Sequence, residues 1–366
     1  MMIMSDRMYI DFHVIQTVPP SCVNRDDTGS PKSCTYGGVR RNRVSSQSWK
    51  KAMRDFFHDS FDSKDLGIRT LRAIDLISEE IVRQDPSMNN DAAKDKAKSV
   101  LEAAGISIKA KKGKKKDEEE NLQTGALMFI SPKQVEGLAK IALSGNIDKK
   151  QVKAALEGHN CADIALFGRM LADDPSLNVD AASQVAHAIS THRVETEYDF
   201  YTAVDDLQND DNAGAGMMGT VEFNSSTLYR YSTVAIHDLR KNMMDSDEAV
   251  RRTVVEYAKA FLLSMPTGKQ NTFANRGVPD FAYICVRNDQ PVNLAAAFET
   301  PVKPSDSEGY ARRSAEKLAE YKEFACSTFV PEPIAEWQIG MEIEKMGKHG
   351  NLNDVLAQIS SLISSE

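Results

Sequence analysis

Cysteine is scarce in this chain of 366 residues and follows no recognisable pattern. The five cysteines are scattered, without a Cys-x-x-Cys pair or a Cys/His cluster: Cys22, Cys34, Cys161, Cys285 and Cys326. A disulfide framework and a structural zinc site both need regular spacings of these residues. The pattern therefore argues against both, and we expect reduced thiols, no bound metal and no other cofactor.

Long apolar runs are lacking as well. No run approaches the ~20 residues that a membrane-spanning helix needs. Met1–Arg7 leads directly into a predicted strand, without the apolar segment of a secretory signal. A content of 41% hydrophobic and 27% charged residues is ordinary for a globular protein. We expect a cytoplasmic protein with no membrane partner.

An excess of positive charge is also missing from the chain as a whole, whose net charge is −8. One segment differs, because Val39–Arg54 contains six cations and no acid: Arg40, Arg41, Arg43, Lys50, Lys51 and Arg54. Clustered cations are typical of a phosphate-binding surface, since a bound polyanion releases its counterions. The alternative is a solvated helix face with charged ends.

The residues around this basic segment predict a loop followed by a helix. Gly37–Gly38 allows positive φ and a close approach of the backbone to a ligand, and Ser45 or Ser46 is a good N-cap. A buried helical stripe is predicted for Trp49, Ala52, Met53 and Phe56. Lys50 and Arg54 would lie one turn apart on the same side. The loop arginines, the helix start and the helix cations are therefore predicted to face one phosphate backbone.

The chain outside this segment indicates a mixed α+β fold. Tyr9–Gln16 is predicted to be a strand with an apolar face and a polar face, and His13 lies on the polar side as a sheet-surface residue. Residues 61–182 have an almost wholly helical pattern, and Ser131 begins one helix with a capping box. Strand patterns return at 228–236 and 281–286.

Two segments contain too little apolar surface for a core of their own. Lys109–Lys116 carries six lysines and precedes the acids of Asp117–Glu120. We expect a poorly ordered loop over about 107–122; the alternative is a second nucleic-acid-binding arm. The acidic, glycine-rich Asn209–Gly219 is predicted to be the tip of a β-ribbon with arms at 196–201 and 220–223.

Catalytic patterns are weak. The paired carboxylates Asp26-Asp27 and Asp205-Asp206 would point to opposite faces of a strand, so neither pair converges on a metal ion unless the backbone turns. His187 and His192 exceed the i, i+4 spacing of a helical metal pair, so we interpret them as packing or hydrogen-bonding residues. No Ser/His/Asp or Cys/His nucleophile spacing is present. We expect no enzymatic activity.

Five blocks of sequence resemble a known family. They are PSCVNRDD with GGVRRNRVSSQSWKKAMR (20–27 and 37–54), DIALFGRM (163–170), QVAHAISTH (184–192), YTAVDDL (201–207) and KQ (269–270). These blocks are similar, in the same order, to those of the CasC family. Its members are the Cas-seven-type backbone subunits of Cascade, the type I-E CRISPR surveillance complex. The family has phenylalanine where this chain has Tyr201.

The resemblance implies an α+β fold with an RRM-like (ferredoxin-like) palm, an inserted helical fingers domain and a β-ribbon thumb. The palm would take residues 1–60 and 228–366, the fingers 61–190 and the thumb 191–227. Copies would assemble head to tail along a guide RNA (crRNA), hold its phosphate backbone and present its bases in segments to a target DNA strand. Further implied partners are the other Cascade subunits and a recruited helicase-nuclease.

The resemblance also implies the RNA-binding residues. They are Asn24, Arg25, Arg40, Arg41, Arg43, Ser46, Gln47, Lys50, Lys51, Arg54, Arg169, Met170, Phe200, Tyr201, Thr202, Lys269 and Gln270. We expect charge reversal at Arg40, Arg41 and Arg43 to abolish RNA retention without unfolding the protein. Related type III subunits cut RNA with an aspartate of the first loop, so cleavage by Asp26 or Asp27 is the alternative function.

Overall fold

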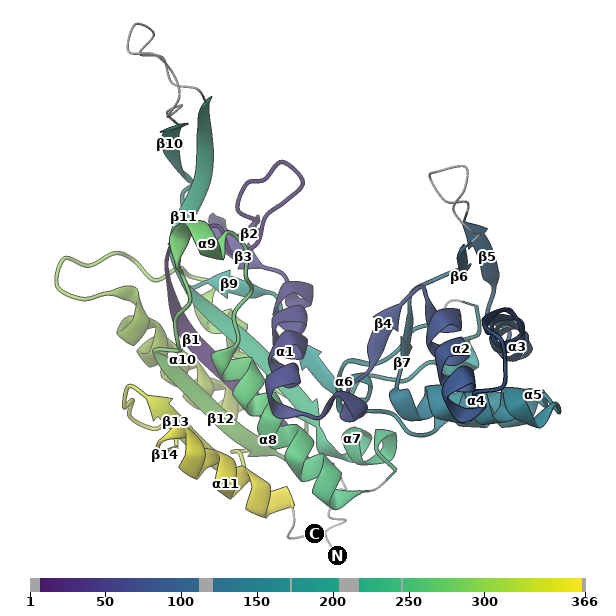
Figure 1. The fold of residues 1–366 in the computed structure, drawn as a ribbon. Coiled ribbons are helices and arrows are strands. Elements are labelled where there is room, and N and C mark those ends of the chain that lie inside the picture. Colours follow the sequence, from purple (N-terminus) through teal and green to yellow (C-terminus); the bar gives the residue numbers. More distant parts are fainter. Residues whose placement is uncertain (1–6, 112–120, 172, 204–216, 245, 364–366) are drawn as a thin grey trace, which may run out of the picture. The chain divides into compact units, whose positions relative to one another are not determined.

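The computed structural model describes residues 7–111, 121–171, 173–203, 217–244 and 246–363. Contacts divide the chain into two compact units, and Figure 1 shows their elements. Unit 1 comprises residues 1–56, 185–233 and 255–366, and unit 2 comprises residues 57–184 and 234–254. The helical insertion predicted for 61–190 overlaps unit 2, and the boundaries between palm, fingers and thumb stay predictions.

Unit 1 contains an open, mostly antiparallel sheet. In spatial order its strands are β14 (Lys348–His349), β13 (Ala335–Gly340), β12 (Phe281–Arg287), β1 (Tyr9–Ser21), β11 (Met217–Ala235), β9 (Ala188–Ser190), β3 (Val39–Val44) and β2 (Ser33–Tyr36). β1 pairs antiparallel with β12, so that Asp11 lies opposite Cys285. The long strands β1 and β11 therefore lie inside the sheet, where both of their edges are paired.

The predicted RRM-like topology is confirmed by the strand order. Two helices connect the central strands, α1 (Ser46–Ser60) after β3 and α8 (Asp247–Leu263) after β11. The chain therefore runs β1–α1–β9–β11–α8–β12, whereas the strands lie side by side in the order β12-β1-β11-β9. This is the split β-α-β arrangement of a ferredoxin-like fold.

Aromatic side chains join the two helices to one face of the sheet. The ring of Phe12 in β1 lies 6.0 Å from that of Phe261 in α8. The guanidinium of Arg230 in β11 lies 3.7 Å from the ring centre of Trp49 in α1 and 4.7 Å from that of Phe261. Because all these side chains are buried, α1 is fixed on the sheet by its tryptophan.

The prediction that His13 lies on the surface of the sheet is wrong, because the opposite face of the sheet is covered. The helices η3 (Leu294–Phe298) and α10 (Tyr310–Thr328) pack on that face, so His13 is buried among tyrosines instead of lying on a sheet surface. Its Nδ1 is 2.9 Å from the hydroxyl of Tyr229. Burial, and to a smaller extent the charge of Arg287, lowers the pKa of His13 to about 3.

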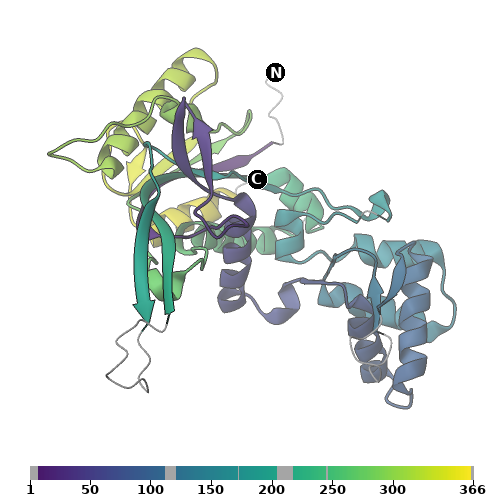
Figure 2. The ribbon, with the colours of Figure 1, turned by 90° about the horizontal axis from the view of Figure 1, so that it is seen from above.

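A two-stranded ribbon extends from this sheet, as both Figure 1 and Figure 2 show. It pairs β10 (Glu197–Ala203) with the first part of β11, from Glu197 opposite Phe223 to Ala203 opposite Met217. The paired arms are longer than predicted, because residues 217–219 of the predicted tip belong to β11. The rest of that tip lies outside the described residues.

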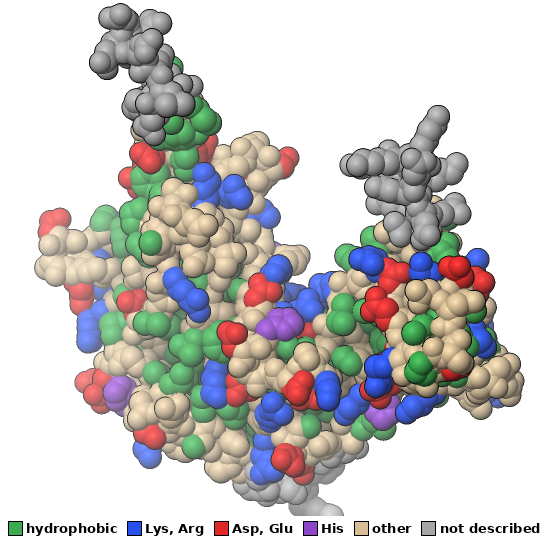
Figure 3. All heavy atoms as spheres, in the orientation of Figure 1, with side chains coloured by type: hydrophobic (Ala, Val, Ile, Leu, Met, Phe, Trp, Pro, Cys, Tyr) green, Lys and Arg blue, Asp and Glu red, His purple; other side chains and the backbone are tan. Residues whose placement is uncertain are grey.

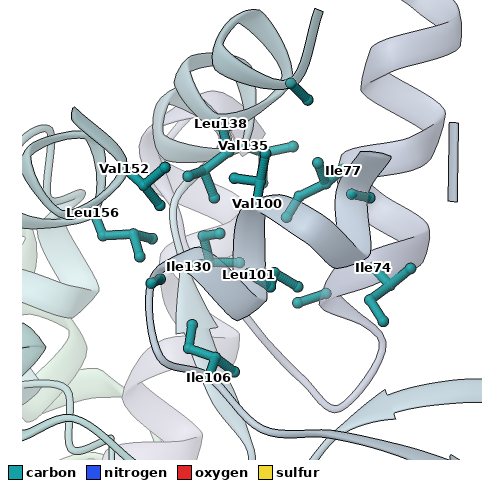
Figure 4. Close-up of a cluster of buried hydrophobic side chains, with 14 of the residues drawn as sticks. Ile74, Ile77, Val100, Leu101, Ile106, Ile130, Val135, Leu138, Val152 and Leu156 are labelled. Atoms are coloured by element: carbon teal, nitrogen blue, oxygen red, sulfur yellow. The ribbon is translucent and has the colours of Figure 1, made fainter. Parts of the chain in front are cut away.

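Unit 2 is mainly helical. Its helices are η1 (Ser63–Asp65), α2 (Ala73–Gln84), α3 (Asn90–Ala103), α4 (Pro132–Ser144), α5 (Lys149–Glu157), α6 (Ala162–Phe167), η2 (Pro175–Leu177) and α7 (Ile236–Asn242). Figure 4 shows the apolar side chains of α2 to α5 meeting in one core. The predicted capping box of Ser131 and Gln134 is present, and Gly145 ends α4 with φ of 74°.

Two short sheets interrupt the almost wholly helical pattern predicted for this region. β4 (Ile68–Thr70) pairs with β7 (Met128–Ile130), and β5 (Ile108–Lys111) pairs with β6 (Asn121–Thr124). Both ends of the segment 107–122, which we expected to be poorly ordered, therefore contain paired strands. Residues 112–120 lie outside the described residues.

The remaining elements are short or lie near the C-terminus. They are β8 (Ser183–Val185), α9 (Gln270–Phe273) and α11 (Leu352–Ile363). The apolar face of α11 is buried, with Val355, Ile359 and Ile363 almost inaccessible. None of the helices in the described part of the chain has the length and hydropathy needed to cross a membrane.

Candidate nucleic-acid interface

The basic segment folds as a strand followed directly by a helix. β3 ends at Val44 and α1 begins at Ser46, and the backbone N–H of Ser45 donates to the Asn24 side chain at 2.9 Å. Trp49, like Ala52 and Met53, is buried as predicted, whereas Phe56 is half-buried. Asn24 therefore ties the loop after β1 to the start of α1.

The cations of this segment do not all have the same surroundings. Arg40 and Lys51 are exposed, and Arg43 is half-buried, as are Lys50 and Arg54. The Lys51 ammonium lies 2.7 Å from the carboxylate of Asp55, one turn further along α1. Because both side chains are exposed, this pair contributes little to stability, but it lowers the charge that Lys51 offers to a ligand.

Arg41 does not have the exposed surroundings that the predicted phosphate contact requires. Its side chain is fully buried and donates from Nε to the Tyr36 carbonyl at 3.1 Å, from Nη1 to the Ser190 carbonyl at 3.0 Å and from Nη2 to the Phe298 carbonyl at 2.8 Å. Adjacent residues of a strand point to opposite faces, so Arg40 and Arg41 point in opposite directions, Arg40 toward solvent and Arg41 into the protein. Arg41 thus joins three backbone segments, and because its side chain is fully buried it is not accessible to RNA.

The KQ pair lies beside the first loop because Gly268 packs on that loop. A Cβ atom at Gly268 would be 2.0 Å from the Val23 carbonyl oxygen, so any other residue would push the two segments apart. Burial raises the pKa of the Cys22 thiol, and the charges of Arg25 and Lys269 oppose this rise. Both cations are therefore near Cys22, at the end of β1.

Lys269 and Gln270 form the start of α9. Lys269 has a left-handed backbone with φ of 49°, and both side chains are half-buried. Gln47 of α1 is exposed, and its amide can both donate and accept hydrogen bonds. Ser46 is half-buried, and its backbone N–H donates to Nδ1 of His187 at 3.1 Å. The loop after β1, β3, α1 and α9 thus supply polar groups to one region of unit 1.

The aromatic residues of the ribbon point in two directions. Phe200 shares a face with Tyr198 and Met218, whereas Tyr201 lies on the opposite face, because side chains alternate along β10. Phe200 is 64% exposed and Tyr201 is 38% exposed. Figure 3 shows hydrophobic side chains gathered on this ribbon. Thr202, also exposed, lies opposite Met218.

Two predicted contacts, Arg169 and Met170, belong to unit 2. Arg169 is buried and donates to the Leu177 and Leu156 carbonyls, at 3.0 and 2.8 Å. Burial lowers its pKa to about 10. Met170 is 81% exposed. As with Arg41, the bonds of Arg169 give it a structural role, whereas Met170 is accessible to a ligand.

Asp26 and Asp27, the carboxylates that the alternative function of RNA cleavage would use, differ in their hydrogen bonding. Oδ1 of Asp26 accepts hydrogen bonds from the Thr28 N–H, the Thr28 hydroxyl and the Ser30 N–H, at 2.7–3.0 Å. These bonds lower the pKa of Asp26, the Thr28 hydroxyl most, although slight burial opposes them. Asp27 is exposed. The Asp205-Asp206 pair lies outside the described residues.

Metal-ligating side chains gather elsewhere in unit 1. Within the described ranges, Asp11, His13 and Cys285 are the single group of three such side chains with ligand atoms within 4.8 Å of one another. All three are buried. The group contains neither Asp26 nor Asp27, so the loop carboxylates have no third ligand from the described residues.

Sequence reasoning missed two residues of this interface. Lys32 precedes β2, outside the basic segment. His187 accepts a hydrogen bond from the Ser46 N–H, as the interpretation of a hydrogen-bonding residue expects, but its exposed side chain was not assigned to the interface. The two residues lie close together, because the charge of Lys32 contributes to lowering the pKa of His187. Their proximity results from the pairing of β3 with β9, for which the local sequence gives no signal.

Comparison with known proteins connects this geometry to a family. The chain is similar to a solved chain described as "CRISPR RNA-guided surveillance complex, pre-nicking", with 34% identity, a TM-score of 0.84 and coverage of 98% of this chain and 99% of that one. A second, described as "CRISPR RNA-guided surveillance complex", has 28% identity, a TM-score of 0.72 and coverage of 96% and 99%. No curated protein matches. The model of one family, described as CT1975-like protein, matches residues 10–364, and the chain therefore belongs to the CT1975-like family.

Proposed function

We propose that this chain is a guide-RNA-binding backbone subunit of a CRISPR surveillance complex. The observation that carries the proposal is the similarity to a surveillance-complex chain along almost the whole of both chains. The solvent-accessible cations of the unit 1 interface add independent support. They come from the loop after β1, from β3, from α1 and from the start of α9.

The chemistry of this interface suits the backbone of RNA better than its bases. Guanidinium and ammonium groups contact phosphates irrespective of sequence, whereas sequence is read through base edges. A guide must leave its base edges free to pair with target DNA. A subunit that holds the phosphates through Arg25, Arg40, Arg43, Lys50 and Lys269 meets this requirement.

The β10–β11 ribbon supplies the second part of the proposal. Its apolar face, with Tyr198, Phe200 and Met218, is exposed and has the kind of surface on which bases stack. We propose that this face intrudes between neighbouring bases, so that the guide pairs with the target DNA strand in segments. Met170 of unit 2 is accessible for the same kind of contact.

The finer assignment to the type I-E subtype and the CasC subunit rests on the sequence blocks. With it come the proposals that copies assemble head to tail, that other Cascade subunits join them and that a helicase-nuclease is recruited. Open head-to-tail contacts produce a filament, which the length of the RNA would limit.

The chain is proposed to have no enzymatic activity of its own. The alternative, RNA cleavage through Asp26 or Asp27, has weaker support because the carboxylate of Asp26 already accepts three hydrogen bonds within its own loop. A lowered pKa also makes Asp26 a weak base. Cleavage of bound RNA that is lost in both Asp26→Asn and Asp27→Asn would favour the alternative.

The proposed function is tested by co-expressing the chain with a CRISPR array and the remaining presumed subunits. Light scattering, together with absorbance at about 260 and 280 nm, then gives the mass and the nucleic-acid content of the purified particle. We expect a large particle of fixed mass that contains RNA of one length. A monomer free of nucleic acid would contradict the proposal.

A further inference from the structure

His187 occupies a defined position in the unit 1 interface. It lies in the connection between β8 and β9, and its side chain is exposed. Nδ1 accepts the backbone N–H of Ser46, the first residue of α1, at 3.1 Å. A backbone N–H can only donate, so Nδ1 carries no proton, and in the neutral ring the proton is on Nε2. The fold therefore fixes one tautomer of this imidazole.

The charges that shift the pKa of His187 all have the same sign. Partial burial lowers its pKa, and the charges of Arg43, Lys32 and Lys50 lower it further, in that order. Among the described residues, every charge that shifts this pKa is therefore positive. The three cations come from β3, from the loop before β2 and from α1. Such crowding is unfavourable in the free protein, and an anion bound between these groups relieves it.

Arg43 is held in this cluster by its own hydrogen bonds. Its Nε donates to the Ser33 carbonyl at 3.5 Å, and its Nη1 donates to the Ser45 hydroxyl at 3.3 Å. Ser45 immediately precedes the residue whose N–H fixes His187. The cation and the imidazole are therefore positioned by neighbouring atoms of the same turn, and their spacing is set by the protein and not by a ligand.

We propose that the neutral imidazole of His187 donates its Nε2–H to a phosphate oxygen of bound RNA, between the cations Arg43, Lys32 and Lys50. This inference rests on the proposed function and adds a binding residue to it. Protonation of Nδ1 would break the bond with Ser46 and add a fourth positive charge. The ring therefore stays neutral, and it contributes direction to phosphate binding without contributing charge.

Two substitutions separate the two hydrogen bonds of the ring. His187→Asn keeps an acceptor at the position of Nδ1 but has no donor that reaches as far as Nε2. His187→Gln places an amide N–H near the position of Nε2 and leaves the Ser46 N–H without its partner. Lys50→Ala is the matched control, because it removes a charge from the same cluster. Each variant is compared with the full-length wild-type chain.

The experiment measures the affinity for a labelled single-stranded RNA of mixed sequence by fluorescence anisotropy over a range of salt concentrations. We expect His187→Asn to bind about 5–10-fold more weakly with an unchanged salt slope, and His187→Gln to stay within about threefold of the wild type. Lys50→Ala should reduce the salt slope by about 0.7. The loss in His187→Asn should be equal at about pH 7.5 and about pH 8.5, because a ring whose pKa lies below its usual value is neutral at both.

Three outcomes would count against this inference or its basis. Wild-type affinity in His187→Asn, with an unchanged unfolding temperature, would overturn the inference. A salt slope that falls in His187→Asn as it does in Lys50→Ala would mean that the imidazole carries a charge in the complex, which contradicts the inference. In both cases RNA binding by the wild type would leave the proposed function standing, whereas a wild type that binds no RNA would overturn the proposed function itself.

Discussion

The ring of Tyr201 lies against Gly219, its direct partner on the neighbouring strand, while Phe200 points to the opposite face of the ribbon. A Cβ atom on Gly219 would be only 2.5–2.8 Å from atoms of the Tyr201 ring and hydroxyl. Glycine thus provides the space into which the tyrosine folds. The two adjacent aromatic residues therefore have different roles, one in the ribbon and one toward solvent.

The first prediction concerns this pair. Phe200→Ala should leave the unfolding free energy within about 0.5 kcal/mol of the wild type and weaken RNA binding by about 1–3 kcal/mol, the contribution of one stacked base. Calorimetric unfolding and fluorescence anisotropy measure the two quantities. Glu197→Gln, at the base of the same strand, serves as the control. Undiminished affinity in Phe200→Ala would argue against stacking on this face.

The second prediction separates Arg41 from Arg40. Arg41→Ala leaves the carbonyls of Tyr36, Ser190 and Phe298 without their donor, so we expect a loss of about 3 kcal/mol in unfolding free energy. Arg40→Ala should change this free energy by less than about 0.5 kcal/mol and weaken RNA binding. Chemical denaturation and RNA affinity check both. Charge reversal at Arg40 and Arg43 alone should thus abolish RNA retention in a folded protein, whereas reversal at Arg41 should unfold it.

The third prediction is the dependence of RNA affinity on salt. Six of the nine predicted cations are counted as phosphate contacts when the buried Arg41 and Arg169, and Lys51 beside Asp55, are left out: Arg25, Arg40, Arg43, Lys50, Arg54 and Lys269. Six contacts on a single strand predict a slope of log K against log salt concentration of about −4. Anisotropy titrations at several salt concentrations give this slope. A value near zero would mean that binding does not depend on these cations.

The fourth prediction uses the contact of Gly268 with the first loop. Gly268→Ala places a methyl group against the Val23 carbonyl, so α9 must move away and carry Lys269 and Gln270 with it. We expect about a 10-fold or greater loss of RNA affinity, roughly the contribution of one charged hydrogen bond. Gly309→Ala is a suitable control, because a Cβ there meets no atom within 4 Å. Equal affinity in the two variants would contradict the prediction.

The fifth prediction concerns the acid stability of the buried pair Asp11 and His13. Burial raises the pKa of Asp11 to about 6, although hydrogen bonds and the charge of Arg287 oppose the rise. In the same layer the pKa of His13 is lowered to about 3. Between about pH 4 and 6 the folded protein therefore holds a proton on Asp11, and the unfolded chain holds one on His13. These protons cancel, so the pair contributes no slope to stability in this window.

Asp11→Asn removes this cancellation. The unfolded variant still binds a proton at His13 and the folded variant binds none, so its stability should fall by about 1.4 kcal/mol for each pH unit of acidification between about pH 6 and 4, relative to the wild type. Denaturation curves at several pH values give the difference in slope. Parallel pH profiles for the two proteins would show that the two side chains do not exchange a proton on unfolding.

Local patterns predicted a large part of this fold. The capping box at Ser131, the buried tryptophan of α1 and the strand predicted at Tyr9–Gln16 each depend on residues close in sequence. The loop glycines and the density of cations led us to predict a phosphate-binding region, which stays a prediction. The resemblance then supplied the RRM-like topology, which the strand order confirms.

Long-range contacts explain the parts that the sequence did not reveal. Arg41 resembles its neighbours in composition, and it is buried because the carbonyls of Ser190 and Phe298 surround it in the folded chain. His13 is buried because α10, about 300 residues later, covers its face of the sheet. His187 joins the interface through the pairing of β3 with β9. None of these contacts has a signature within a window of neighbouring residues.

The split arrangement of the sheet has a consequence for folding during translation. β1 leaves the ribosome early, but its antiparallel partner β12 begins only at Phe281, after all of the residues of unit 2. At about 5–20 residues per second, β1 waits roughly 15–60 s for that partner. During this time its apolar residues and the edge that later pairs with β12 are open to association with other chains. Slower translation should therefore increase aggregation of the nascent chain, and a chaperone that shelters extended segments should reduce it.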